Sequence, residues 1–294
     1  MKITRCIAAA AVMAAWSGAA NAAAILYGVD NETDTLVAID TVTGVVSTVG
    51  STNPSTLPYY NYIGMTVGPD GTIYVTDQNS YGVQGGLATL DRTTGAETSR
   101  VDILLSGYYP IAQTGIAFDS DGTLYSVQNY SSGAALNILD KDTGALTVID
   151  SLAAQIIGGN YPTTIAFSPD GVLFGMDNRH LISIDKTTGD VTEIGSNLAD
   201  IYGNNLSMTF GDDGTLYVAT RGINDYLLTL DPLTGAVLTS LLLSSTDSSL
   251  DLGGIAYFME GDVNPPSEVP IPAAAFLFAP FAAGFMRLKR RKAS

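Results

Sequence analysis

A five-residue motif, Asp-x-x-Thr-Gly, occurs five times and constrains the fold of this chain more than any other feature. Its glycines are separated by 51, 49, 45 and 46 residues. A unit of nearly fifty residues copied five times is typical of a propeller or a solenoid. The copies are DTVTG (Asp40 to Gly44), DRTTG (Asp91 to Gly95), DKDTG (Asp140 to Gly144), DKTTG (Asp185 to Gly189) and DPLTG (Asp231 to Gly235).

A second turn, built on Asp-Gly, lies some twenty residues before the motif and starts a short apolar run. Around the two turns are four short runs rich in Val, Ile, Leu, Thr, Tyr and Phe, which is the composition of strands. Four up-and-down strands per unit make one propeller blade. In both turns the Asp can accept backbone N–H bonds and the Gly supplies a positive φ, so we interpret them as structural. The second turns are GPDGTIYV (Gly68 to Val75), DSDGTLYSV (Asp119 to Val127), SPDGVLFGM (Ser168 to Met176) and GDDGTLYVA (Gly211 to Ala219).

The first copy is incomplete, and its missing strand lies at the other end of the domain. The chain enters the repeats at ILYGVD (Ile25 to Asp30), which corresponds to the second strand of the other copies. After the fifth copy comes GGIAYFMEGD (Gly253 to Asp262), which corresponds to a first strand and its turn. A shared strand that closes the ring removes exposed sheet edges. The sequence therefore predicts an all-β fold, a closed five-bladed β-propeller over residues 23–262.

The N-terminal 22 residues have the three parts of a secretory signal peptide. Lys2 and Arg5 precede an apolar stretch, and small residues end in Ala20-Asn21-Ala22. We expect cleavage after Ala22. The only cysteine, Cys6, leaves with this segment. The mature protein is then expected to be exported, with no disulfide and no cysteine nucleophile.

The C-terminus carries a second targeting signal. After a Pro-rich linker at 263–268 comes an apolar segment from Val269 to Phe285, followed by a basic cluster. About 17 helical residues cover some 25 Å, enough for a short membrane span. The basic cluster would stay cytoplasmic, so the helix would hold the propeller outside the membrane. The cluster consists of Arg287, Lys289, Arg290, Arg291 and Lys292.

This tail, residues 269–294, resembles the PEP-CTERM class of sorting signals in its VPLPA-type variant. The motif is VPIPA, formed by Val269, Pro270, Ile271, Pro272 and Ala273, with Ile271 where the name motif has Leu. The resemblance implies recognition by an exosortase-like processing enzyme, cleavage near the motif, and transfer to the cell surface or extracellular matrix. The alternative is a plain C-terminal membrane anchor.

The repeats resemble more loosely those of exported propellers of the YncE, NHL and SMP-30-like kind, through their xPDGxLY and LDxxTG pairs. Those families include binding proteins and lactonases, so the resemblance implies the fold and little more. Without the two basic residues of the leader and the five of the tail, six Lys and Arg remain against 29 Asp and Glu, a net charge of −23. Such a domain repels nucleic acid and anionic lipid. No cofactor is expected, apart from loosely bound Ca²⁺.

Ten of the fifteen tyrosines fall in the connections predicted for the face opposite the repeated turns. Exposed aromatic rings with Asn and Gln suit a surface polysaccharide or a matrix protein. The alternative is that these tyrosines pack their own loops. The candidate ligand-binding residues are Tyr59, Tyr60, Tyr62, Tyr108, Tyr109, Tyr161 and Tyr202, with Asn31, Asn129 and Asn178; Tyr81, Tyr130 and Tyr226 complete the ten.

A polar ring is predicted just after the second strand of each blade. Asp30, Asp77 and Asp177 take equivalent positions there, with Gln128 and Thr220 in the other two blades. Three carboxylates around one axis could bind a cation or act as acid and base in a glycosidase. Equally, an Asp at a strand end can cap its own loop. His180, the only histidine, lies three residues from Asp177 and is a further candidate base.

These observations predict an exported, non-enzymatic propeller that binds a glycan or protein of the cell surface or matrix. The first alternative is a glycosidase or lactonase-like hydrolase that uses the Asp ring. The second is a purely structural matrix protein. DSDG at Asp119 lacks the remaining ligands of a calcium loop, which disfavours a dedicated calcium site there.

Overall fold

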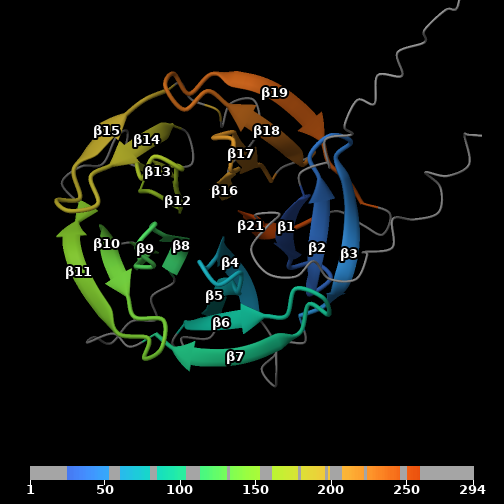
Figure 1. Ribbon diagram of the computed structural model, residues 1–294, viewed down its shortest axis with the longest axis horizontal. Coiled ribbons are helices and arrows are strands. Elements are labelled where there is room, and N and C mark those ends of the chain that lie inside the picture. Colours follow the sequence, from blue (N-terminus) through green and yellow to red (C-terminus); the bar gives the residue numbers. More distant parts are fainter. Residues whose placement is uncertain are drawn as a thin grey trace, which may run out of the picture.

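The computed structural model describes residues 25–52, 60–79, 85–103, 113–130, 133–152, 161–177, 180–195, 198, 207–221, 224–245 and 250–258. Over these residues the chain forms five sheets, antiparallel apart from one two-residue edge strand, arranged as a ring around a central axis (Figure 1). The predicted all-β, five-bladed propeller is confirmed. The described part of the chain contains no helix long and apolar enough to cross a membrane. The predicted leader, linker and sorting tail lie outside it.

Four blades follow one plan, with four strands in sequence order from the axis outward (Figure 1). Their strands are short, as expected from short apolar runs between repeated turns. Blade two has β4 (Tyr60–Val67), β5 (Ile73–Asn79), β6 (Gly86–Leu90) and β7 (Glu97–Asp102); blade three has β8 (Gln113–Phe118), β9 (Leu124–Tyr130), β10 (Gly133–Leu139) and β11 (Leu146–Ser151); blade four has β12 (Thr164–Phe167), β13 (Leu173–Met176), β14 (Leu181–Ile184) and β15 (Val191–Glu193); blade five has β16 (Ser207–Phe210), β17 (Leu216–Ala219), β18 (Tyr226–Leu230) and β19 (Val237–Leu242).

Blade one joins the two ends of the domain. β1 (Ile25–Asp30), β2 (Thr35–Asp40) and β3 (Val45–Ser51) come from the N-terminal end, and β21 (Leu252–Tyr257) supplies the innermost strand. β21 pairs antiparallel with β1, so the predicted closure by a C-terminal strand is confirmed. A two-residue strand that the sequence did not predict, β20 (Ser244–Ser245), pairs parallel with β3 and covers the outer edge of this blade.

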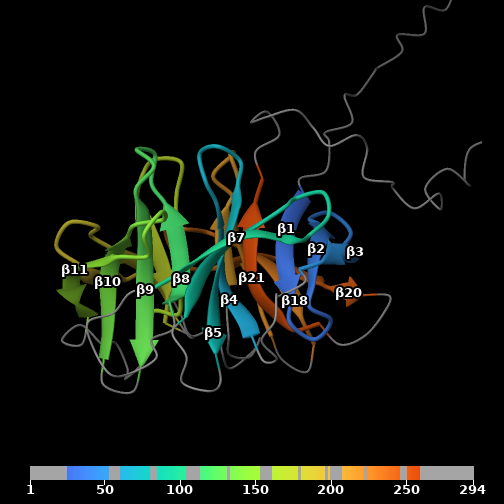
Figure 2. The same cartoon turned by 90° about the horizontal axis from the view of Figure 1, so that it is seen from below.

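Both families of repeated turns lie on the same face of the ring, because consecutive strands are antiparallel. We call it the repeat-turn face; it is the upper side in Figure 2, and the opposite side is the loop face. In each Asp-x-x-Thr-Gly turn the Gly has a φ between 68° and 80°, and its N–H donates to the Asp carbonyl. The Asp side chain accepts the N–H groups two or three positions on, as Asp91 does from Thr93 and Thr94. The structural interpretation of these turns is confirmed.

Aromatic pairs fill the core between neighbouring blades on the repeat-turn side. A ring from the second strand of one blade contacts the last residue of the innermost strand of the next. Between blades one and two this position is Val67, and Tyr27 contacts Phe258 instead, 6.2 Å between ring centroids. Burial of rings of this size stabilises the fold by about 1.5–3 kcal/mol each. The other pairs, with centroid distances, are Tyr74–Phe118 (5.1 Å), Tyr125–Phe167 (5.3 Å), Phe174–Phe210 (5.2 Å) and Tyr217–Tyr257 (6.3 Å).

Candidate functional sites around the central channel

The predicted polar ring occupies one structural position in all five blades, the end of the second strand on the loop face. All five side chains are buried, with exposed fractions of at most 4%. Their burial follows from the fold, since a second strand has an innermost strand on one side and a third strand on the other. The members are Asp30, Asp77, Gln128, Asp177 and Thr220.

In all five blades the ring residue is hydrogen-bonded to its own blade or to the adjoining connection. Asp177 Oδ1 accepts the N–H of His180 at 2.7 Å, and its Oδ2 lies 3.2 Å from His180 Nδ1. Thr220 Oγ1 accepts the N–H of Tyr226 at 3.1 Å. Gln128 Oε1 accepts from Gln113 Nε2 on the neighbouring strand at 3.4 Å. These contacts fasten the start of the third strand or the innermost strand to the second.

Asp77 belongs to a buried charged pair in blade two. Its Oδ1 accepts the N–H of Gly86 at 3.0 Å, and its Oδ2 forms an ion pair with Arg100 of the outermost strand. The Arg100 side chain passes directly over Gly86, where a Cβ would lie 2.4 Å from a guanidinium nitrogen. Burial raises the pKa of Asp77 above its ordinary value, although Arg100 and the Gly86 amide act in the opposite direction. The pair holds three strands of the blade together.

Asp30 forms hydrogen bonds within blade one, and Asn31 connects this blade to blade two. Asp30 accepts the N–H groups of Glu32 and Asp251 and the hydroxyl of Thr33. Asn31 pairs with the backbone of Tyr62 in blade two, since its Nδ2 donates to the carbonyl and its Oδ1 accepts the N–H, both at 2.9 Å. The side-chain amide of Asn31 therefore acts as a strand-like link between two blades.

The three aspartates predicted as a metal or acid–base set hold separate partners. Asp30 binds its loop, Asp77 binds Arg100, and Asp177 binds His180. Among the residues that the structure describes, no group of three or more His, Cys, Asp and Glu side chains could hold a metal ion. Asp119 of the DSDG turn accepts two backbone N–H groups and pairs with Lys186 Nζ at 2.8 Å. Burial would raise the pKa of Asp119, but Lys186 and the amides lower it overall.

Only part of the predicted tyrosine surface lies within the described residues. Tyr62 is buried, at 3% exposed, in β4, and its hydroxyl donates to Glu97 Oε2 at 2.8 Å. The expectation that Tyr62 is an exposed loop residue is therefore wrong, because the strand begins earlier than the sequence suggested. Tyr161 and Tyr226 are half-buried against core clusters. Outside the description lie Tyr59, Tyr81, Tyr108, Tyr109, Tyr202 and Asn178, the side chains of Tyr60, Tyr130 and Asn129, and the tail from Val269 to Lys292.

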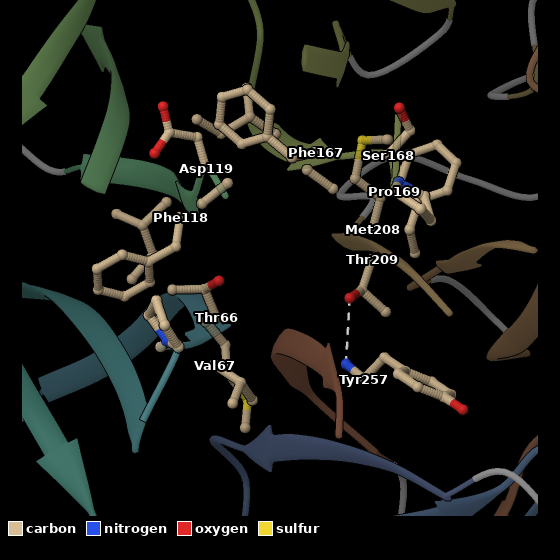
Figure 3. Close-up of a pocket in the computed structure, with 18 of the residues that line it drawn as sticks. Thr66, Val67, Phe118, Asp119, Phe167, Ser168, Pro169, Met208, Thr209 and Tyr257 are labelled. Atoms are coloured by element: carbon tan, nitrogen blue, oxygen red, sulfur yellow. Dashed lines mark hydrogen bonds between the residues drawn. The ribbon is translucent and has the colours of Figure 1, made fainter. Parts of the chain in front are cut away.

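A cavity of about 360 Å³ occupies the repeat-turn half of the central channel, where no site was predicted. Its wall is formed by the ends of the five innermost strands and by the turns that follow three of them. Figure 3 shows the hollow, with Thr66 and Thr209 pointing their hydroxyls toward it. Thr209 Oγ1 accepts the N–H of Tyr257 from the next blade at 3.1 Å. The volume is within the range of small-ligand sites.

The sequence did contain a signal for this cavity. The penultimate residue of each innermost strand is a Thr or an Ala, and in blades two to five this residue lines the hollow. The five residues are Thr66, Ala117, Ala166, Thr209 and Ala256. Thr and Ala at this position belong to no motif, whereas the turns beside it carry the repeated Asp and Gly.

No family model matches the chain, and no curated protein matches it either. Among solved structures, a chain of a nidogen–laminin complex is 13% identical, with 80% of this chain and 98% of that chain covered and a TM-score of 0.52. A protein of unknown function from Bacteroides caccae is 11% identical, with 81% and 100% covered and a TM-score of 0.53. A gluconolactonase from Xanthomonas campestris is 15% identical, with 76% and 77% covered and a TM-score of 0.46. At these identities the likeness is one of fold alone.

Proposed function

We propose that this protein is an exported propeller of the cell surface or extracellular matrix that binds a glycan or a protein without catalysing a reaction. The N-terminal leader and the VPIPA tail support export and sorting by an exosortase-type system, with the membrane as a temporary anchor. The net negative charge of the domain supports a neutral or basic partner over nucleic acid.

One observation carries the non-catalytic half of this proposal. The described carboxylates of the polar ring, where the repeat could have placed an acid and a base, are buried and bound to backbone amides, Arg100 or His180. General acid–base catalysis needs a side chain within hydrogen-bond reach of substrate and free to exchange a proton. A carboxylate that holds a loop in place is poorly suited to that task.

The contact between Asp177 and His180 favours the second candidate, a glycosidase or lactonase-like hydrolase. An Asp that orients a His is one part of a nucleophilic or general-base arrangement. Asp177 accepts the backbone N–H of His180 as well as facing its ring, so one carboxylate fixes both the loop and the imidazole. Hydrolysis that is lost in Asp177→Asn, with the fold retained, would support this candidate.

A glycan array with the full chain tests the binding proposal. We expect retention of the wild type on one class of surface glycan, or capture by a matrix protein if the partner is a protein. Tyr108→Ala and Tyr202→Ala test the predicted tyrosine surface, with Tyr74→Phe as a control, because Tyr74 is buried against Phe118 and lies outside the predicted set. No retention and no partner would leave the structural matrix protein as the better account.

Deletion of Arg287 to Lys292 tests the sorting tail separately. We expect loss of surface display and accumulation of the unprocessed chain in the membrane. Unchanged display would contradict exosortase-type sorting without affecting the binding proposal.

A further inference from the structure

The inner wall of the cavity exposes backbone groups, and the strand register identifies them. In blades two to five, the residue after the innermost strand donates its N–H to the carbonyl of the residue just before the second strand, as Gly68 does to Thr72 and Gly211 to Thr215. Hydrogen-bonded and non-bonded residues alternate in an antiparallel pair. The N–H and C=O of the last strand residue therefore point away from the second strand, toward the axis.

One of these amides already shows what they can bind. Tyr257 N–H donates to Thr209 Oγ1 of the preceding blade. The corresponding positions before Phe210, Phe167 and Val67 are Ala166, Ala117 and Ala256, which carry no acceptor. Of the five amides at this level, those of Tyr257 and Phe118 have a threonine, Thr209 and Thr66, at this position of the preceding blade, and the other three have an alanine.

The cavity also lacks an uncompensated charge among its described lining residues. Asp119, the only carboxylate among them, is paired with Lys186 and holds its own turn. Behind the peptide groups the wall is apolar, with Met65, Ile116, Ile165 and Met208 toward the floor. Donors, acceptors and hydroxyls therefore surround a neutral space.

We propose that this cavity binds the terminal residue of a neutral glycan, a pyranose ring whose hydroxyls exchange hydrogen bonds with the inner-edge peptide groups and with Thr66. A sugar hydroxyl both donates and accepts, so it suits a wall that presents N–H and C=O groups side by side. The inward-facing carbonyls and the negative field of the domain disfavour an anion, and the inward-facing amides disfavour a cation. The inference rests on the proposed binding function and moves its site to the repeat-turn face.

Two substitutions alter the cavity in different ways. Thr66→Val keeps the β-branched shape and removes a hydroxyl. Ala166→Thr introduces at blade four the hydroxyl that Thr209 provides at blade five, so that it can occupy the Phe210 amide and narrow the hollow. Thr239→Val is the matched control, because Thr239 is an exposed threonine of outermost strand β19 whose hydroxyl contacts Thr229.

The test titrates the full chain in detergent with methyl glycosides of glucose, galactose, mannose and N-acetylglucosamine, followed by NMR or calorimetry. Charged comparators are methyl glucuronide, methyl glucosaminide and Ca²⁺. We expect one neutral glycoside to bind, with affinity reduced about 5- to 10-fold by Thr66→Val and at least about 10-fold by Ala166→Thr, and unchanged by Thr239→Val. Thermal unfolding verifies that each variant folds.

Each other outcome overturns a defined part of the inference. Neutral binding that is unchanged in both cavity variants but lost in Tyr108→Ala or Tyr202→Ala assigns the glycan to the predicted tyrosine surface and refutes the cavity site, while the proposed function stands. Binding of only a charged sugar or Ca²⁺ refutes the ligand class. If none of the probes binds, the cavity inference fails, and a protein partner captured by the full chain would still support the proposed function.

Discussion

The aspartates at the two faces of the propeller look equivalent in the sequence and behave in opposite ways in the structure. Asp91, in a repeated turn, is partly exposed, and hydrogen bonds from the Thr94 amide and hydroxyl lower its pKa. Asp77, in the polar ring of the loop face, is buried, and desolvation raises its pKa. Both side chains stabilise the backbone: Asp91 caps a partly exposed turn, and Asp77 links three strands inside blade two. Acidic residues that recur in a repeat therefore do not identify a binding site.

Removal of Arg100 is expected to have the largest effect, because it leaves Asp77 buried without its cation. Arg100→Met should lower the free energy of unfolding by about 3–5 kcal/mol at neutral pH. The loss should shrink toward pH 4. A carboxyl whose pKa is raised on folding favours the folded state below its ordinary pKa and loses that contribution as the pH rises through the folded value.

Urea unfolding at pH 7.5 and pH 4 measures this difference. Lys141→Met, which removes an exposed ion pair with Asp142, is the control and should leave stability unchanged. An equal loss for Arg100→Met at both pH values would mean that the buried carboxylate is not the cause.

A side chain introduced where two backbones approach closely, at a turn of the repeat-turn face, is expected to have the next largest effect on stability. Gly95 has a φ of 77°, and a Cβ there would lie 2.5 Å from the carbonyl oxygen of Gly50 in blade one. Gly214 has a φ of 80°, with no atom within 4 Å of its added Cβ. Gly95→Ala should cost about 2–4 kcal/mol and Gly214→Ala only about 1–2 kcal/mol. If thermal unfolding showed similar losses of stability for the two variants, the contact between blades one and two would add nothing to the cost of a positive φ.

Removal of the Asp91 charge should have the smallest effect on stability, and its pH dependence should be opposite to that of Asp77. Asp91→Asn retains an oxygen acceptor but weakens the bonds to Thr93 and Thr94, for a loss of at most about 1 kcal/mol at pH 7. Because the folded pKa is lowered, this contribution is present above the ordinary pKa and is lost as the pH falls through the folded value. The free energies of unfolding of wild type and variant should converge below pH 3. A difference that persists there would contradict the role of the Asp91 charge in capping the turn.

Much of the fold could be predicted from the sequence because the repeat fixes both the number of blades and their strand order. The unpaired ILYGVD start and the GGIAYF segment at the end predicted closure, which β1 and β21 confirm. β20 could not be predicted, since two residues carry no periodicity and their parallel pairing with β3 depends on tertiary contact. Tyr62 was misplaced because a Tyr-rich segment resembles a loop until Glu97, far along the chain, supplies its partner.

The sites were predicted less well, for a physical reason. The polar ring was located correctly, but the sequence could not distinguish a free carboxylate from one that holds Arg100 or His180. The cavity depends on small residues and on backbone groups at a free strand edge. Ala117 and Ala166 have no polar side-chain atom. Only the strand register in three dimensions indicates that the backbone amides beside them lack a hydroxyl partner.

The most direct test of a binding role measures retention and turnover on the same sample. The full chain is incubated with surface polysaccharides and with lactones, and bound protein, released reducing ends and released acid are followed together. The account predicts retention on a neutral glycan with no product above that of a heat-denatured control, in the wild type and in Asp177→Asn alike. Repeated release of product by the wild type, abolished in a folded Asp177→Asn variant, would contradict it.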